Sequence, residues 1–236
     1  MQYLDTLMHM SAWQLFLVFL IQNLLVFAAA LGLGYIIRLL FQVPSQQITR
    51  KEWRLAGITV IINSVITLVG GLLWQSGFIH LQSGWNSTVL TDTIILFLAM
   101  DLLMYVFHYL IHHSVLYRYI HQLHHEAIDP TPVDLFVLHP VETIGFGLLW
   151  LMVLLSGHFN LLAVILYLCL NVVFGVVGHL GFEPLGRHGS GQWKAFQWMG
   201  TSSFHHAHHR DINGNFGFYT SIWDRLFRTY LPADKK

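Results

Sequence analysis

The sequence predicts an all-α integral membrane protein of four to five transmembrane or re-entrant helices, with a cytoplasmic histidine-rich cap that holds a dimetal centre. Three observations predict this class. Hydrophobic residues make up 55% of the 236 residues, whereas charged residues make up only 10%. Apolar stretches long enough to cross a bilayer recur along the chain. Histidine is abundant, with 16 residues, and most of them lie in three short clusters.

Composition also excludes several classes of protein. The formal net charge is zero, so no basic surface suited to nucleic acid is expected. The single cysteine, Cys169, excludes an intramolecular disulfide and a thiolate zinc finger. Residues 1–12 contain no Lys or Arg, so we expect the first apolar stretch to be a retained span and not a cleaved signal peptide.

The apolar stretches define the predicted helices in order. Three clear spans are followed by two shorter runs, which the turn-like tetrapeptide Gly-His-Phe-Asn joins. Each short run has fewer than the ~20 residues that a bilayer core requires. They form either a hairpin that crosses or nearly crosses the membrane, or a re-entrant pair whose tip stops short of the far surface. The five predicted helices are about 13–37, 55–74, 93–111, 141–156 and 161–177.

The basic residues predict how the chain is oriented. If every span crosses, all twelve Lys and Arg lie on one face, together with the segment from Leu180 onward. The other face receives the N-terminus, the 75–90 loop and the hairpin tip, which carry none. The positive-inside rule therefore predicts a cytoplasmic basic face and an external N-terminus, in a bacterial inner membrane or in the endoplasmic reticulum membrane of a eukaryote. The basic residues are Arg38, Arg50, Lys51, Arg54, Arg118, Arg187, Lys194, Arg210, Arg225, Arg228, Lys235 and Lys236.

Three histidine motifs have helical spacing. One is H-x-x-x-H at His108 and His112, and the others are H-x-x-H-H at 121–125 and at 205–209. Residues at i, i+3 and i+4 share one face of a helix, so each motif is expected to aim its imidazoles at a single point. Neutral imidazole is the commonest protein metal ligand. The predicted topology gathers these motifs and His179 at one membrane surface, where distant segments converge on one metal site.

The number of histidines predicts two metal ions. Sites that are rich in imidazole and lack thiolate suit Zn, Cu, Fe or Ni. One tetrahedral zinc takes four ligands, and the three motifs with His179 offer more than twice that number. Spacing alone does not distinguish iron from zinc. The predicted ligands are His108, His112, His121, His124, His125, His179, His205, His208 and His209.

The motifs resemble the histidine boxes of the fatty acid hydroxylase/sterol desaturase superfamily, which are membrane non-haem di-iron oxygenases. The boxes are HYLIHH, HQLHH and HHAHH, at 108–113, 121–125 and 205–209. The likeness extends to Asp101 and Tyr105 before the first box, to LHPVE at 138–142, to 171–179, and to NFGFYTSIWDRLFRTY at 215–230. It covers about 92–230. Two departures are the three residues inside the first box, where some members have four, and Arg228, where glycine is usual.

The resemblance implies a single membrane domain over 1–236, with N-terminal spans at 1–90 and the catalytic region at 91–230. It implies two iron ions, dioxygen, and electrons from an external electron-transfer protein, used to hydroxylate or desaturate a C–H bond of a sterol-like, fatty acyl or isoprenoid lipid. Zinc can occupy the same ligands in purified protein. A pocket between the third and fifth spans would hold the lipid. The alternative is a membrane zinc-binding protein or metal transporter without oxidative activity.

Further polar residues complete the predicted site. His113 and His206 neighbour predicted ligands but lie about 100° around the helix from them, which favours contact with the ligands or the surface over coordination. Asp101 is expected to hold a ligand from another helix or to bond Asn171. Beyond the nine ligands, the candidates for extra ligands or for groups that contact the ligands are His139, Asp101, Asn171, His113 and His206. Three loop carboxylates, Glu126, Asp129 and Asp134, either accept hydrogen bonds from the ligands or are solvated.

Overall fold

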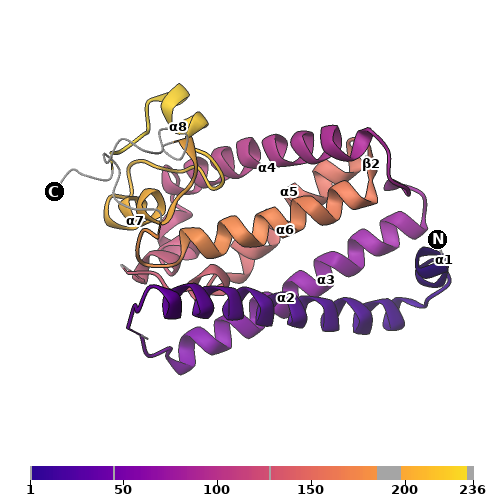
Figure 1. The fold of residues 1–236 in the computed structure, drawn as a ribbon, viewed down its shortest axis with the longest axis horizontal. Coiled ribbons are helices and arrows are strands. Elements are labelled where there is room, and N and C mark those ends of the chain that lie inside the picture. The colour runs from indigo at the N-terminus through magenta and orange to yellow at the C-terminus, as the bar shows by residue number, and fades with distance from the viewer. Residues whose placement is uncertain (1, 45, 128, 185–197, 233–236) are drawn as a thin grey trace.

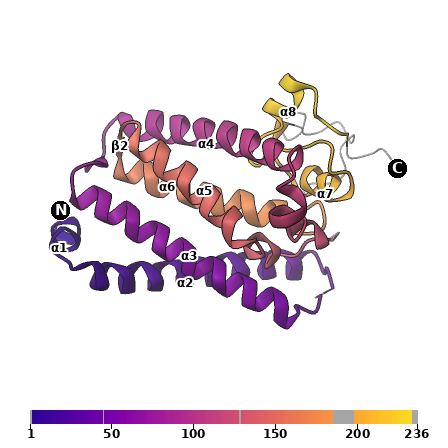
Figure 2. The same cartoon turned by 180° about the vertical axis from the view of Figure 1, so that it is seen from behind.

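The computed structural model describes residues 2–44, 46–127, 129–184 and 198–232 as a bundle of long helices with a cap at one end (Figure 1). In both views α4 and α2 form opposite edges of the bundle, and the α5–α6 hairpin lies between them (Figure 2). The short helices α7 and α8 lie at the end opposite to α1. The helices are α1 (Gln2–Met8), α2 (Ala12–Leu40), α3 (Arg50–Gln75), α4 (Thr88–His112), α5 (Pro140–Leu155), α6 (Leu161–Gly178), α7 (Ser202–Arg210) and α8 (Ile222–Phe227).

Local sequence explains where these helices begin. Ser11 precedes α2 and forms a reciprocal capping box with Gln14, and Thr49 does the same with Glu52 before α3. The helix α3 therefore starts five residues before the predicted apolar span, because its first turn is polar and capped. The first turn of α5 contains Pro140, whose missing N–H would in any case have no partner inside the helix.

The predicted all-α membrane class is confirmed. Four helices, α2, α3, α4 and α6, are long and apolar enough to cross a membrane, and α5 is an apolar helix of 16 residues. Apolar side chains are exposed along these helices, as expected where lipid covers them. All the described Lys and Arg residues lie toward the end that carries α7 and α8. Arg187, Lys194, Lys235 and Lys236 lie outside the described residues.

The tip of the α5–α6 hairpin reaches the connection between α3 and α4. Strand β2 (His158–Asn160) at this tip pairs in parallel with β1 (His80–Gln82), so two three-residue strands interrupt the all-helical pattern. The rings of His80 and His158 stack with their centroids 4.3 Å apart. The backbone N–H of Asn160 also donates to Asp92 near the start of α4, at 2.7 Å. The hairpin therefore extends as far as α3 and α4 do, which favours the full hairpin over a tip that stops short.

Core side chains fill the interface between α4 and α6. Leu96, Met100 and Met104 of α4 belong to one buried cluster with Ala163 and Tyr167 of α6. These side chains fill their part of the region between the third and fifth spans, and the lipid pocket expected there stays a prediction. On another side of α6, Gly175 packs against the 3₁₀ turn η3 (Asp134–Phe136), where an added Cβ atom would lie 2.7 Å from Leu135.

Candidate metal centre

All nine histidines predicted as ligands lie together at one end of the bundle, in two adjacent groups. Within each group, one ligand atom from every residue lies within 4.8 Å of the others. Their grouping is a structural fact, whereas their role as ligands remains a prediction. The first histidine group is His108, His112, His121, His125 and His208, and the second histidine group is His124, His179, His205 and His209.

The two H-x-x-H-H motifs do not each aim at one point, as the spacing suggested. In both motifs the i and i+4 histidines join one group and the i+3 histidine joins the other. His205 and His209 thus belong to the second group, and His208 to the first. The reason is angular: adjacent helical residues differ by about 100°, so neighbours such as His208 and His209 diverge toward different centres. Each motif therefore contributes to both groups.

The segment that carries the second motif is not a regular α-helix. A π-helical turn, η1 (Tyr117–His121), ends at His121, and a 3₁₀ turn, η2 (His124–Glu126), begins at His124. The N–H of Gln122 reaches back five residues to the carbonyl of Tyr117, at 2.8 Å. Such local departures from α-helical geometry are frequent at functional sites. Here the wider and narrower turns let one short segment supply ligands to both groups.

Hydrogen bonds on the outer ring nitrogens fix several histidine tautomers. The Nδ1–H of His108 donates to the carbonyl of Phe216 at 2.9 Å, and that of His208 donates to Gly214 at 2.6 Å. In the second group the Nδ1–H of His179 donates to Gly175 at 2.8 Å. A ring that is protonated at Nδ1 presents a lone pair at Nε2. The Nε2 atoms of these residues are therefore available to a metal ion.

A buried carboxylate fixes a fourth tautomer. His121 Nδ1 lies 2.7 Å from Glu142 Oε1, and both side chains are almost fully buried. A carboxylate that accepts from one nitrogen of a metal-bound imidazole sets the ring orientation and raises its basicity. Although Glu142 stands in the quoted LHPVE segment, sequence reasoning gave it no role. Its place at the fourth position of the H-P-x-E pattern was the signal that could have found it.

The inner nitrogens fit a metal ion. His108 Nε2 and His121 Nε2 lie 2.9 Å apart, although the Nδ1 hydrogen bonds leave a lone pair on each. Two facing lone pairs repel unless a cation lies between them. Metal–nitrogen bonds of about 2.0–2.1 Å place neighbouring ligand atoms roughly 3 Å apart, which matches this spacing.

The second histidine group shows the same pattern. His205 Nε2 lies 3.2 Å from His179 Nε2 and 3.1 Å from His209 Nε2. In the first group, the buried Nε2 of His208 has no hydrogen-bond partner among the described residues. A buried polar atom without a partner is costly, and a bound cation would remove that cost. Both groups therefore fit one ion each.

Burial keeps these imidazoles neutral, as metal binding requires. Desolvation lowers the pKa of His124 to about 3 and that of His179 to about 4. It also lowers the pKa of His121, His205 and His208 well below the usual value, and neighbouring histidines add to the effect. A pKa far below 7 means that the ring is unprotonated at neutral pH and can donate its lone pair.

The other histidines predicted near the site lie outside both groups. His139 caps the N-terminus of α5, where its Nδ1 accepts from the N–H of Val141. The exposed His113 stacks on Tyr109 and bonds its carbonyl. His206 points to Asp129, with 2.9 Å between Nε2 and Oδ1.

Asp101 and Asn171 hold the C-terminal segment and bond no histidine among the described residues. The carboxylate of Asp101 accepts from the backbone N–H groups of Tyr219 and Thr220 and from the indole of Trp223. Asn171 accepts from the hydroxyl of Tyr219 at 2.6 Å. The expectation that Asp101 holds a ligand or bonds Asn171 directly is not met. Both residues instead fix the segment whose backbone carbonyls orient His108 and His208.

The three loop carboxylates also contact partners other than the nine histidines. Glu126 pairs with Lys51 at 2.6 Å, and both side chains are more than half exposed. Asp129 lies near His206 and Arg210. Asp134 accepts from the N–H and hydroxyl of Thr131. These pairs tie the loops of the histidine-bearing end together.

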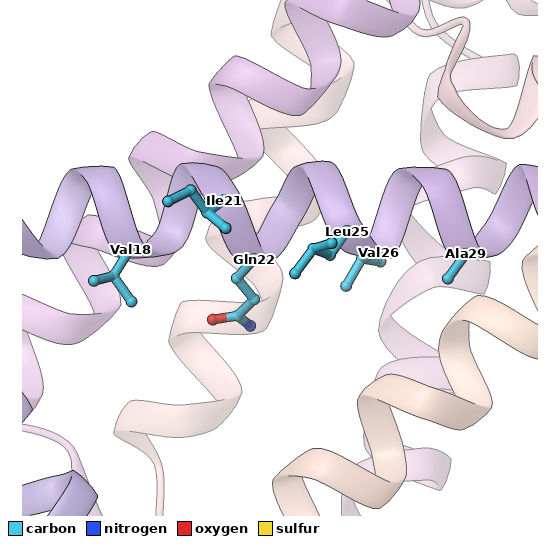
Figure 3. Close-up of a pocket in the computed structure, with 6 residues that line it drawn as sticks. All are labelled: Val18, Ile21, Gln22, Leu25, Val26 and Ala29. Atoms are coloured by element: carbon cyan, nitrogen blue, oxygen red, sulfur yellow. The ribbon is translucent and has the colours of Figure 1, made fainter.

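An open hollow of ≈ 530 Å³ runs along α2 (Figure 3). One stripe of that helix lines it, and the amide of Gln22 is the polar group among apolar side chains. All of its lining residues belong to α2, so it is an open groove on the surface of one helix and not an enclosed site. The lining residues are Val18, Ile21, Gln22, Leu25, Val26 and Ala29.

An apolar helical bundle with two adjacent histidine groups at one end defines the class: an all-α membrane protein whose histidines could hold metal ions. The sequence profile of the fatty acid hydroxylase family matches residues 93–229, more than half of the chain. The protein belongs to this family, as the resemblance of its motifs predicted. The matched residues hold every member of both histidine groups.

The chain is similar to several curated proteins. It is 29% identical to methylsterol monooxygenase 1 of Gallus gallus over 141 residues, which are 56% of this chain and 45% of that protein. Identity is 27% to a very-long-chain aldehyde decarbonylase of Oryza sativa subsp. japonica, over 69% of this chain and 28% of the relative. The chain is also 27% identical to a probable Delta(7)-sterol 5(6)-desaturase of Neurospora crassa, over 57% of this chain and 36% of that protein. The chain thus spans less than half the length of these relatives. No solved structure matches it.

Proposed function

We propose that this protein is a membrane-bound di-iron oxygenase that hydroxylates or desaturates a C–H bond of a lipid, with dioxygen and electrons from an external electron-transfer protein. The observation that carries the proposal is the pair of adjacent histidine groups, whose inner nitrogens face each other at the spacing of metal ligands. Iron is proposed over zinc because the related proteins are named as a monooxygenase, a desaturase and a decarbonylase.

The protein's own residues would prepare the site. The nine histidines would hold two iron ions, and these ions, when bound, supply the activation of dioxygen. Glu142 and the carbonyls of Gly175, Gly214 and Phe216 keep protons on the outer ring nitrogens, so that the inner nitrogens stay free. Burial of the second group and of His121 and His208 in the first limits the access of bulk water. Such positioning and dryness are what a protein contributes to metal-based oxidation.

A lipid substrate agrees with the surroundings of the centre. The centre lies at one end of helices whose apolar side chains are exposed, so a substrate dissolved in the bilayer would lie close to it. Within the lipids, the named relatives favour a sterol-like or long-chain substrate. We propose a cytoplasmic centre, because the described basic residues lie at its end of the bundle.

Lipid mass spectrometry tests this function. Cells that express the protein should contain a lipid with one added oxygen or two fewer hydrogens, which the His208→Ala variant does not produce. His113→Ala is the matched control, because His113 is an exposed histidine outside both groups. Equal lipid profiles in cells with the native protein and with His208→Ala would contradict oxygenase activity. Zinc binding by both proteins with no lipid product would favour the non-oxidative alternative.

A further inference from the structure

The short helix α8 lies near the end of α4 that is closest to α7 (Figure 1), and two of its side chains contact α4 before the last turns of that helix. The indole N–H of Trp223 donates to Asp101 Oδ2 at 3.0 Å, and the ring of Phe227 stacks on Tyr105 with 5.6 Å between centroids. Asp101 is close to the midpoint of α4 (Thr88–His112). In both views α8 lies on the outer side of α4, away from the α5–α6 hairpin (Figures 1 and 2). A segment of the cap therefore contacts a membrane-spanning helix well below its end.

The depth of α8 follows from the far end of the bundle. Asp92 is level with the hairpin tip, because it accepts the backbone N–H of Asn160. A bilayer core of ~30 Å takes about 20 helical residues, so it extends from the level of Asp92 to near the end of α4. At 1.5 Å per residue, Asp101 and Tyr105 lie roughly 14 Å and 20 Å above Asp92. The residues of α4 that α8 contacts thus lie within the thickness that acyl chains occupy.

The surface of α8 continues the lipid-facing surface of α4. Ile94 and Leu98 lie on the same stripe of α4 as Asp101 and Tyr105, seven and three residues before Asp101, and they are 49% and 42% exposed. Farther toward the metal-centre end, where Phe227 stacks on Tyr105, Leu226 and Phe227 of α8 are 64% and 55% exposed. In a membrane, acyl chains must cover Ile94 and Leu98, and the exposed apolar side chains of α8 lie on the same side of α4.

The polar groups of α8 suit such a place. Buried Asp224 accepts from the N–H groups of Phe216 and Gly217 and from the hydroxyl of Thr229, so its carboxylate does not face lipid. The guanidinium of Arg225 lies over the ring of Tyr230, at 3.9 Å. Exposed Arg228 follows the helix and can extend its charge toward the headgroups. Satisfied polar groups are the condition for backbone to lie among lipids.

We propose that α8 dips into the bilayer on the metal-centre side, with Leu226 and Phe227 in contact with acyl chains. The segment that α8 anchors also carries Phe216, whose carbonyl orients His108, and it therefore couples the histidine groups to the lipid surface. This proposal concerns a lipid-binding surface and does not depend on the oxygenase activity proposed above. Its failure and the failure of that activity are therefore distinguishable.

Spin labels on single cysteines test the proposal. In a Cys169→Ser background, labels are placed at Leu226, at Leu98 as a lipid-facing reference, and at the exposed Asp211 as a water-facing reference. Each protein is reconstituted in phosphatidylcholine nanodiscs, and collisions of the label with oxygen, which concentrates in lipid, are compared with collisions with a water-soluble nickel chelate. Arg228 provides a second labelling position on the same segment if the Leu226 variant does not fold. It is also exposed, and its label should be nearer to the headgroups.

The possible outcomes distinguish a label at Leu226 that lies in lipid from one that faces water and from one that protein covers. The expected ratio of oxygen to nickel collisions at Leu226 is close to that at Leu98 and at least severalfold above that at Asp211. A ratio at Leu226 equal to that at Asp211 would overturn the proposal, because the helix would then face water. An immobile label that neither reagent reaches would also overturn it, since a second protein copy or another partner would then cover α8.

Discussion

At the scale of single residues, the candidate centre depends on which ring nitrogen of each histidine carries the proton. Backbone carbonyls at Phe216, Gly214 and Gly175 select the Nδ1–H tautomer of three histidines, and Glu142 selects that of a fourth. A histidine that is oriented in this way loses little freedom when it binds a metal. Residues that do not belong to the histidine groups would therefore influence how well a bound metal is held.

The motif at 205–209 gives a first prediction, because its histidines have three different surroundings. His205→Ala and His209→Ala should each empty the second group, whereas His208→Ala should empty the first, so each variant retains about one metal ion per chain. His206→Ala should retain about two, because that side chain points to Asp129. Elemental analysis of the four purified variants measures this, with gel filtration in detergent as the check of folding. Equal metal loss in all four variants would contradict the division into two groups.

A second prediction concerns Glu142. Glu142→Ala removes the acceptor of the His121 Nδ1–H and should weaken metal binding by about 10- to 100-fold, as loss of such a hydrogen bond does in other metal sites. Competition with a chelator of known affinity measures the change. Glu126→Ala is the matched control, because it removes a carboxylate near the site that pairs with Lys51 at the surface. An equal effect of both substitutions would show that Glu142 acts only through general charge.

At the scale of elements, the C-terminal segment closes over the ends of α4 and α6 through two buried carboxylates. Asp101 reaches out from α4 to Tyr219, Thr220 and Trp223, and Asp224 folds the segment onto itself. Both carboxylates accept several hydrogen bonds, which compensates for their burial. The segment thereby brings two backbone carbonyls to the outer nitrogens of the first histidine group.

A third prediction follows from the close approach at Gly217. A Cβ atom there would lie 2.2 Å from the carbonyl oxygen of Thr220 and 2.7 Å from Asp224 Oδ2. Gly217→Ala should therefore displace the segment, lower the thermal unfolding temperature and make residues 211–221 sensitive to protease. Gly57→Ala, where nothing lies within 4 Å, is the matched control and should change stability little. Unchanged protease resistance in Gly217→Ala would mean that the segment does not depend on this packing.

A fourth prediction tests how Asp101 holds the segment. Asp101→Ala leaves buried N–H donors of Tyr219 and Thr220 without an acceptor, which should cost about 1–3 kcal/mol for each group left unsatisfied. Thermal unfolding in detergent measures the loss. Asp92→Ala is a useful comparison, because that carboxylate accepts one backbone N–H at the far end of the same helix. Destabilisation no greater than in Asp92→Ala would contradict the central role of Asp101.

At the scale of the whole molecule, the two ends of the bundle differ in chemistry. One end carries the histidine groups and the described basic residues, and the other carries the β1–β2 pair, α1 and the stacked rings of His80 and His158. The pairing of β1 and β2 ties the hairpin tip to the connection between α3 and α4. Long apolar helices between these two ends are what a protein that crosses a bilayer requires.

The fifth prediction is the orientation of the bundle. In a Cys169→Ser background, a cysteine at Trp85, which is 84% exposed in the loop before α4, should react with an impermeant maleimide from outside the cell. A cysteine at Arg54, at the opposite end, should react only after the membrane is permeabilised. The basic residues gather at the end of Arg54, which the positive-inside rule assigns to the cytoplasm. Labelling of both positions from the same side would show that the number of crossings is wrong.

Much of the architecture is local in origin and could be predicted from sequence. A helix in lipid must be apolar over about 20 residues, so α2, α3, α4 and α6 are visible as long apolar runs. The spacing of the histidines identified eight members of the two groups, because residues on one face of a helix recur every three or four positions, whereas the ninth, His179, was predicted from its place after an apolar helix and from the family resemblance. The family could also be recognised from the sequence, because its motifs are short and occur in a fixed order along the chain.

Tertiary structure alone decided how these parts meet. Spacing fixes the angle of a side chain around its own helix, but which partner it reaches depends on how other elements cross that helix. For this reason the sequence could not show that His208 and His209 serve different groups, that Glu142 contacts His121, or that Asp101 holds the C-terminal segment. Likewise, the packed α4–α6 interface and the depth of α8 depend on contacts between residues far apart in the chain.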